Sequence, residues 1–257
     1  MTTALVTGAT AGIGLAFVRR LAADGHDLVL VARDQQRLDE VAAELRTAYG
    51  RQVETLSADL TDRAAVQRVA DRLADASRPV DVLVNNAGFG LGRGFLSTDV
   101  ADEERLLDIH CRAVLVLTHA AGRAMRDRRS GTIINVSSVA GFAAMGTYSA
   151  VKAWATVFSE SVATQLAPYG VRVMALCPGF VRTEFHGRGG MDMSALPEWG
   201  WLDADDLVAE ALADVAKGKV VSVPSRRFGT LVLAMRHLPR SVVRKGSGAV
   251  QRRRTQG

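Results

Sequence analysis

The chain has 257 residues, of which 48% are hydrophobic and 23% are charged, a balance that excludes a disordered or low-complexity chain. No apolar run approaches the ~18 residues of a membrane-spanning helix, and residues 4–6 are too short for the core of an export signal. Two cysteines, Cys111 and Cys177, cannot form a disulfide framework, so we expect a soluble protein of the reducing cytoplasm.

The basic charge is concentrated near the C-terminus. The formal net charge is +5, yet residues 225–257 carry nine Arg and Lys and no Asp or Glu. Removing these nine from the 32 basic residues leaves 23 against 27 acidic residues in 1–224, a net charge of −4. The high basicity is therefore local, and we expect no nucleic-acid partner.

Seven short runs rich in β-branched residues alternate with longer segments of helical periodicity. Near-continuous apolar runs of this kind are typical of parallel strands that are covered on both faces. Strands joined by helices predict an α/β fold, a doubly wound Rossmann-type seven-stranded parallel sheet with helices on both faces. The predicted strands are residues 3–7, 28–32, 52–57, 80–85, 132–137, 171–177 and 220–223.

Residues 1–224 contain no linker or change of composition, which predicts a single domain. One irregular segment, residues 184–202, has four glycines and no clear period. A long irregular segment in a compact domain is often a functional lid, and its apolar side chains favour an apolar ligand, although they would also close against the core. These side chains are Phe185, Met191, Met193, Leu196, Trp199 and Trp201, and Phe142 and Met145 are candidates to join them.

Residues 225–257 form a basic amphipathic C-terminal extension. Pro239 divides its apolar residues, so two short helices are favoured over one long helix. One interpretation is peripheral contact with an anionic membrane, because such a surface attracts arginines beside a shallow apolar face. The alternative is that the apolar residues pack on the sheet domain or on a second subunit.

A glycine-rich turn follows the first predicted strand and precedes a helix predicted over residues 13–23. Gly8, Gly12 and Gly14 would allow a tight turn, leave room for a pyrophosphate and let the helix pack on the strand. N–H groups at the start of the helix would then bind phosphate. This turn, with Thr10 and Ile13, is a candidate nucleotide site, although most glycine-rich turns are plain turns.

The choice between NAD and NADP is expected at the end of the second predicted strand. An acidic residue there would hold the ribose 2′-hydroxyl and repel a 2′-phosphate, but the strand ends in Ala32-Arg33-Asp34. The planar guanidinium of Arg33 suits a phosphate, which favours NADP(H) over NAD(H). Alternatively, Arg33 is solvated, or Asp34 pairs with it or lies near the ribose.

Tyr148 and Lys152 lie four residues apart on one face of a predicted helix, and Ser138 precedes them at the end of a strand. With the glycine-rich turn, these residues make the chain resemble the classical short-chain dehydrogenase/reductase family. The resemblance extends from residue 3 to about residue 223. It also includes, in family order, motifs at Asp59-Leu60, Asn85-Asn86-Ala87-Gly88 and Pro178-Gly179-Phe180-Val181-Arg182-Thr183.

The resemblance implies that Tyr148 gives a proton to the alkoxide that hydride transfer produces from a ketone. The pKa of a free phenol is about 10, and lowering it to 7 requires roughly 4 kcal/mol. A cation about 4 Å away at an effective dielectric of 20 supplies about that energy, so Lys152 with the nicotinamide ring would suffice. Ser138 would hold the substrate oxygen. Without the resemblance, Tyr148 and Lys152 would be an ordinary helix residue and a surface charge.

The resemblance also implies a cofactor site. Asp59 would bind the adenine, and Lys152 would hold the nicotinamide ribose. Val181 and Thr183 would receive the carboxamide and a phosphate. The implied cofactor-binding residues are Gly8, Thr10, Gly12, Ile13, Gly14, Arg33, Asp59, Leu60, Asn86, Ala87, Gly88, Lys152, Pro178, Gly179, Val181 and Thr183. No metal is implied.

Three positions depart from the family pattern. His110 occupies the place of an asparagine that supports a water chain to the lysine, so it either replaces that residue in the proton relay or is a satisfied buried histidine. Ser138 precedes Tyr148 by ten residues, fewer than is usual, which leaves open whether Ser137 or Ser138 faces the substrate. Ala11 stands where phosphate-preferring relatives often have a basic residue, so Arg33 is the main argument for NADP.

These features predict an NADP(H)-dependent oxidoreductase that interconverts an apolar ketone or aldehyde and an alcohol. The alternative is a nucleotide-binding regulatory protein of the same fold with little turnover. The intact Ser138, Tyr148 and Lys152 argue against that alternative, and His110 argues weakly for it. Expected partners are the small carbonyl or alcohol substrate and further copies of the chain.

Overall fold

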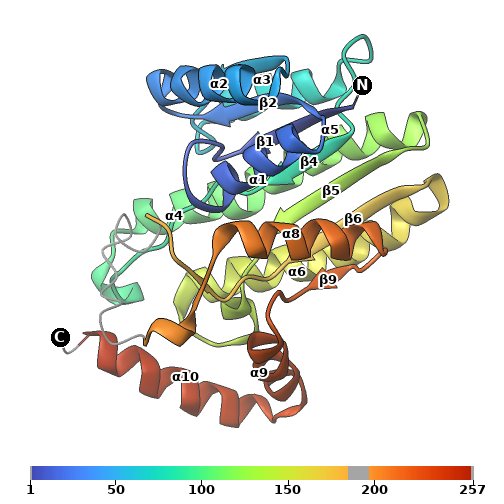
Figure 1. The fold of residues 1–257 in the computed structure, drawn as a ribbon. Coiled ribbons are helices and arrows are strands. Elements are labelled where there is room, and N and C mark those ends of the chain that lie inside the picture. Colours follow the sequence, from blue (N-terminus) through green and yellow to red (C-terminus); the bar gives the residue numbers. More distant parts are fainter. Residues whose placement is uncertain (1, 185–196, 256–257) are drawn as a thin grey trace.

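A seven-stranded parallel sheet forms the centre of the molecule (Figure 1). The computed structural model describes residues 2–184 and 197–255, with side chains described through residue 247. The strand order β3-β2-β1-β4-β5-β6-β9 confirms the predicted doubly wound sheet. Each predicted strand is present, with ends that differ by at most two residues. The strands are β1 (Thr3–Thr7), β2 (Asp27–Ala32), β3 (Val53–Ser57), β4 (Val82–Asn85), β5 (Gly131–Val136), β6 (Val171–Leu176) and β9 (Val221–Ser222).

Helices cover both faces of the sheet (Figure 1). One layer is formed by α1 (Gly12–Ala23), α2 (Gln35–Tyr49) and α8 (Ala204–Ala216), and the other by α3 (Arg63–Ala74), α5 (Val114–Asp127) and α6 (Gly146–Leu166). Side chains alternate along a strand, so Ala4 and Val6 of β1 enter one core while Leu5 enters the other. The near-continuous apolar strands therefore supply two cores at once.

The connections contain short helical segments that matter for the site. They are η1 (Phe95–Ser97), α4 (Val100–Leu107), the π-helical turn η2 (Asp108–Ala113), η3 (Val139–Phe142) and η4 (Ala167–Tyr169). Because η2 joins α4 directly to α5, these three segments form one continuous helical run with an irregular middle. Such π-helical turns occur frequently at functional sites.

The chain order reverses at β1, since β2 and β3 lie on one side of it and β4 lies on the other. In open α/β sheets, ligands bind beyond the carboxyl ends of the strands at such a reversal. The topology therefore brings the glycine-rich turn after β1 together with the residues that follow β4.

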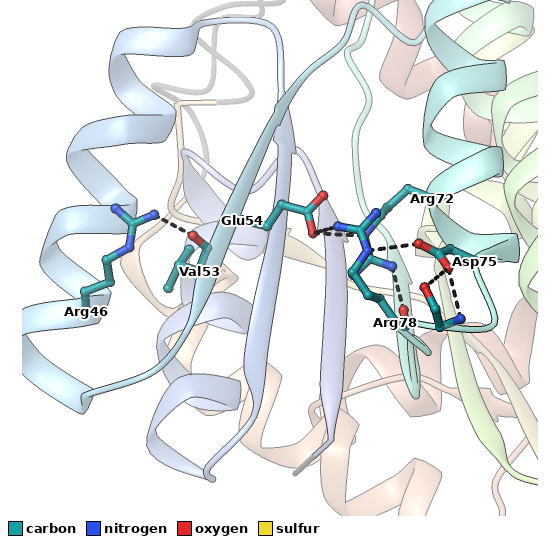
Figure 2. A network of polar contacts seen from close by, with 7 residues as sticks. Arg46, Val53, Glu54, Arg72, Asp75 and Arg78 are labelled. Atoms are coloured by element: carbon teal, nitrogen blue, oxygen red, sulfur yellow. Dashed lines mark hydrogen bonds and ion pairs between the residues drawn. The ribbon is translucent and has the colours of Figure 1, made fainter.

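The opposite end of the sheet carries a network of ion pairs (Figure 2). Glu54 of β3 accepts from Arg72 Nε at 2.9 Å and from Arg78 Nη1 at 3.3 Å, and Arg78 Nε also pairs with Asp75 at 2.9 Å. Glu54 lies near the start of β3 and Arg72 near the end of α3. The network thus fixes α3 to the amino ends of the strands, away from the switch point.

The residues just before the predicted lid pair with its last residues. β7 (Phe180–Val181) pairs in parallel with β8 (Trp201–Leu202), which η5 (Glu198–Gly200) precedes. Trp199 is 70% exposed, whereas Trp201 is partly buried with its ring 6.5 Å from that of Phe180. Residues 185–196, with the predicted Phe185, Met191, Met193 and Leu196, lie outside the described residues. The lid function stays a prediction.

The C-terminal extension forms two helices, α9 (Arg226–His237) and α10 (Arg240–Thr255), which meet at Pro239 as the sequence predicts. Val232, Val243 and Ser247 are buried, so the extension packs against the rest of the molecule. Leu231 and Leu233 remain 48% and 59% exposed. No helix within residues 2–184 and 197–255 has the length and apolar character needed to cross a bilayer.

Candidate active site

The glycine-rich turn lies at the switch point and leaves the start of α1 open. The residue before α1, Ala11, provides no side-chain cap for the first N–H groups of the helix. A Cβ atom on Gly14 would overlap the carbonyl oxygen of Gly8, so only glycine permits this close approach of helix and strand. Uncapped N–H groups at a helix N-terminus form an anion site. The turn is therefore a candidate anion site.

Residues after β4 hydrogen-bond to this turn. The Thr7 hydroxyl accepts the backbone N–H groups of Asn86 and Ala87, each at 3.0 Å. The Asn86 amide in turn donates to the Thr7 carbonyl at 3.0 Å. On the other side, a Cβ atom on Gly12 would lie 3.0 Å from the Thr183 side chain. Segments that are distant in sequence thus meet around one turn, as the family resemblance implies.

The adenosine end of the candidate site contains Asp59 and Arg33. Burial would raise the pKa of Asp59, but hydrogen bonds from the Thr61 N–H and hydroxyl lower it overall, with help from the positive charges of Arg33 and Arg105. Asp59 is therefore a carboxylate in the field of an exposed Arg33. Asp34 accepts the Arg37 backbone N–H at 3.1 Å and caps α2, a role that the sequence analysis did not assign to it.

Arg37 is a site residue that sequence reasoning missed. Its Nη2 lies 3.4 Å from the Thr10 carbonyl oxygen in the glycine-rich turn and 3.6 Å from Glu184 at the start of the predicted lid. Arg37 lies in the first turn of α2, four positions after Arg33, and no motif in the sequence marks it. It adds a second guanidinium beside the candidate phosphate site.

Some predicted cofactor residues act through packing or backbone groups. The side chains of Leu60 and Val181 are buried in the two apolar cores. The Pro178 carbonyl accepts the Val139 N–H at 2.9 Å and so ties the end of β6 to the segment after β5. Leu60 and Val181 therefore place the neighbouring chain, and their side chains take no part in a polar contact.

The Lys152 ammonium is the buried charge of the site. Its side chain is 5% exposed, and Nζ donates to the Val136 carbonyl oxygen at 2.7 Å. Nζ lies 5.7 Å from the centroid of the Tyr148 ring on the same helix, α6. Burial lowers the pKa of Lys152 to about 8, while the two cysteines nearby act in the opposite direction.

The two serines after β5 have different roles. Ser137 is buried, donates to the Lys152 carbonyl at 2.6 Å and lies 2.8 Å from the Thr156 hydroxyl. Ser138 instead hydrogen-bonds the Tyr148 side chain and accepts the Ala140 N–H at 3.1 Å. Ser138 is therefore the serine beside Tyr148, and Ser137 fixes α6 to the sheet.

The pKa of Tyr148 in the protein alone is governed by burial and by Ser138. Burial raises the pKa of Tyr148, and among the protein groups the hydrogen bond from Ser138 acts to lower it. The expected approach to 7, which the sequence analysis attributes to Lys152 together with the nicotinamide ring, is not produced by the protein groups alone and stays a prediction. Tyr148 is held as a protonated phenol, the form that donates a proton to an alkoxide.

His110 lies beside Tyr148 in the π-helical turn η2. Its Nε2 is 2.8 Å from the Phe89 carbonyl oxygen, which can only accept, so Nε2 carries a proton. The His110 ring meets the Tyr148 ring edge-on at 5.7 Å, and a Cβ atom on Gly88 would overlap it. Burial and the charge of Lys152 hold the pKa of His110 well below its ordinary value. His110 is thus a neutral, hydrogen-bonded ring.

The polar side chains of the candidate site are of the kinds that bind a dinucleotide, and those described do not group as metal ligands. Among the described residues, no three His, Cys, Asp or Glu side chains lie together as a metal site requires. Burial raises the pKa of Cys111 to about 11 and also raises that of Cys177, so both are thiols at neutral pH. From the glycine-rich turn to Lys152, the polar groups instead follow the carboxyl edge of the sheet.

The chain is similar in sequence to dehydrogenases and reductases. The family model for short chain dehydrogenase matches residues 2–192. Sulfoacetaldehyde reductase 2 of Chromohalobacter salexigens is 36% identical over 217 residues, which cover 82% of this chain and 85% of that protein.

The chain is also similar to solved structures of dehydrogenases. A short-chain dehydrogenase from Sphingobium yanoikuyae in complex with NADPH aligns with a TM-score of 0.85 and 38% identity, over 93% of this chain and 96% of that one. The bulky-bulky ketone specific alcohol dehydrogenase from Comamonas testosteroni aligns with a TM-score of 0.80 and 31% identity, over 94% and 96% of the two chains.

Proposed function

Because the chain belongs to the short-chain dehydrogenase/reductase family, whose members reduce carbonyls or oxidise alcohols, we propose that it uses NADP(H) and acts on an apolar ketone or aldehyde. The observation that carries this proposal is the contact of Tyr148 with Ser138 beside the buried Lys152, next to the open turn before α1. A regulatory protein that only bound the nucleotide would have no use for a buried lysine beside a protonated phenol.

The proposed mechanism assigns one step to each side chain. When bound, the reduced nicotinamide would supply the hydride to the carbonyl carbon. Ser138 holds the carbonyl oxygen, and Tyr148 donates its phenolic proton to that oxygen as negative charge develops there. The Lys152 ammonium would hold the nicotinamide ribose and, together with the positive charge of the oxidised nicotinamide ring, would stabilise the resulting phenolate. His110, through Phe89, fixes the backbone beside the reacting groups.

Three observations support NADP(H) over NAD(H). Arg33 is exposed at the end of β2, Arg37 lies beside the glycine-rich turn, and Asp34 is occupied in capping α2. The cap fixes the Asp34 carboxylate to the start of α2, whereas the two guanidinium groups remain at the strand end. The NADPH bound to the Sphingobium yanoikuyae relative is consistent with this assignment.

Aromatic side chains support an apolar substrate. The Phe180 ring lies 6.2 Å from that of Phe228 and 6.5 Å from that of Trp201, next to the Pro178-Gly179 segment. Apolar walls with few polar groups are typical of sites for drug-sized ligands. The relative from Comamonas testosteroni, described as specific for bulky-bulky ketones, has the same fold.

The proposal also includes self-association of this cytoplasmic enzyme. Large apolar side chains are exposed beside and along α4, α5 and α6: Leu96 at 95%, Val100 at 74%, Leu115 at 46% and Val157 at 65%. Exposed apolar side chains that gather on one surface mark interfaces between chains, and we propose that these do so. We further propose that α9 and α10 make peripheral contact with anionic membranes, since their exposed leucines lie among basic residues and no acidic ones.

Tyr148→Phe is expected to reduce the rate of hydride transfer to less than a tenth of normal, because the hydroxyl carries the transferred proton. NADPH binding should stay within a few-fold, since the ring is retained. Ketone-dependent loss of NADPH absorbance and cofactor fluorescence measure the two quantities, with the peripheral Tyr169→Phe as the control. A variant that keeps more than a tenth of the rate would contradict the assignment.

Arg33→Ala should weaken NADPH binding much more than NADH binding. A charge-assisted hydrogen bond to a phosphate contributes about 1.5–3 kcal/mol, which corresponds to roughly 10- to 150-fold in affinity. Fluorescence titration with both cofactors gives the ratio, and Arg63→Ala, at an exposed position of α3, is the matched control. Equal losses for the two cofactors would show that Arg33 does not contact the 2′-phosphate.

His110→Asn is expected to be tolerated, with a rate equal to or above that of the native protein, because it restores the residue usual in the family. His110→Ala, which removes the N–H that Phe89 accepts, should be slower. Steady-state rates and circular dichroism compare the two variants. Loss of activity in a folded His110→Asn protein would give the imidazole a role of its own.

The membrane proposal predicts that the full chain sediments with anionic vesicles at low salt and not with neutral ones. Replacing Arg244 and Lys245 with alanine removes two charges worth about 1 kcal/mol each, so binding should weaken roughly 30-fold. The exposed pair Arg63 and Arg68 on α3, replaced likewise, is the control. A native protein that ignores anionic vesicles would disprove this contact.

A further inference from the structure

The C-terminal helices reach the segment that separates Ser138 from Tyr148, which we call the catalytic loop (residues 139–147). We propose that α9 and α10 position this loop for catalysis and that Ser247 is the positioning residue through which α10 acts. The proposal rests on the function proposed above. It gives residues 225–247 a catalytic purpose that their basic composition alone does not indicate.

Ser247 of α10 makes a direct hydrogen bond to the catalytic loop. Its hydroxyl oxygen accepts the Ala144 backbone N–H at 3.1 Å, and the side chain is 8% exposed. The two residues are separated by 103 positions in sequence, so the contact depends on the docking of α10. The Ala144 residue is partly buried, and the partner of its backbone N–H comes from the extension.

Two arginines hold the neighbouring residue, Phe142. Arg240 Nη1 donates to the Phe142 carbonyl oxygen at 3.3 Å, and the Arg236 guanidinium lies 5.1 Å from the Phe142 ring centroid. Arg236 also pairs with Glu160 of α6 at 3.5 Å. The loop is thus held from outside at Phe142 and Ala144, both within six residues of Tyr148.

The start of the extension is anchored on the far side of the site. The Phe228 ring packs directly against Gly179, where a Cβ atom would overlap it, and lies 6.2 Å from the Phe180 ring. Arg227 donates to the Trp199 carbonyl oxygen and stacks 5.9 Å from the Trp199 ring centroid. The extension therefore joins the segment after β6 to the catalytic loop, and both lie next to the proposed substrate position.

The inner side of the loop is fixed by short local contacts. Ser138 accepts the Ala140 N–H at 3.1 Å, and Ser149 accepts the Met145 N–H at 3.2 Å. Between these two ends the loop contains the single short turn η3, and the next helix begins at Gly146. Loss of the outer contact at Ala144 should therefore shift Phe142 and Met145, the candidate substrate contacts, while α6 and its Tyr148 and Lys152 stay in place.

The test compares full-length Ser247→Ala and Ser247→Thr with Ser241→Ala, an exposed serine on the same helix. For Ser247→Ala we expect kcat/KM for a ketone to fall about 3- to 10-fold, mainly through KM, because one neutral hydrogen bond is lost. The NADPH dissociation constant should stay within twofold. Ser247→Thr, which keeps the hydroxyl, should recover the native values, and Ser241→Ala should match the native protein.

Amide hydrogen exchange provides a readout that does not depend on turnover. In Ser247→Ala, peptides that cover residues 139–147 should exchange faster, whereas peptides from the glycine-rich turn should not change. Faster loop exchange in a chain without ketone reduction would contradict the proposed function and leave the positioning role intact. Unchanged loop exchange, or a loss of NADPH binding as large as the loss of kcat/KM, would overturn the positioning role.

Discussion

The burial of the Lys152 ammonium is the constraint on which the arrangement of the site depends. A buried charge is costly unless it is hydrogen-bonded, and the partner here is a strand carbonyl, that of Val136, at 2.7 Å. That bond requires α6 to lie against the end of β5, where Ser137 also bonds to the Lys152 carbonyl. The same packing places Tyr148 next to Ser138 and keeps His110 neutral.

The architecture could be predicted from the sequence because its signals are local. Continuous apolar strands such as residues 28–31 occur when both faces are covered, and Gly14 is required where a helix crosses the end of a strand. Asp34 illustrates the limit of such signals. As a residue type it is equally suited to pairing with Arg33, to binding a ribose and to capping a helix, and only the backbone of α2 selects capping.

The details of the site depend on contacts between distant segments, which periodicity does not encode. Which of Ser137 and Ser138 faces the substrate was open in the sequence, and the way β5 meets α6 places Ser138 beside Tyr148. The burial that raises the pKa of Tyr148 is likewise a product of tertiary packing, which no motif in the sequence marks. The contact of Ser247 with Ala144 spans most of the domain, and no motif marks it.

The central claim is that the site is active when the buried Lys152 is charged and Tyr148 is protonated. The pH dependence of ketone reduction at saturating NADPH tests it. Lys152 is charged below its pKa of about 8, and Tyr148, whose pKa burial raises, stays protonated over the same range. The account therefore predicts a constant kcat/KM from about pH 5.5 to about 7 and a decline as the pH rises through about 8. A rate that increases across this range, or an inflection near 6.5 that indicates a titrating His110, would contradict it.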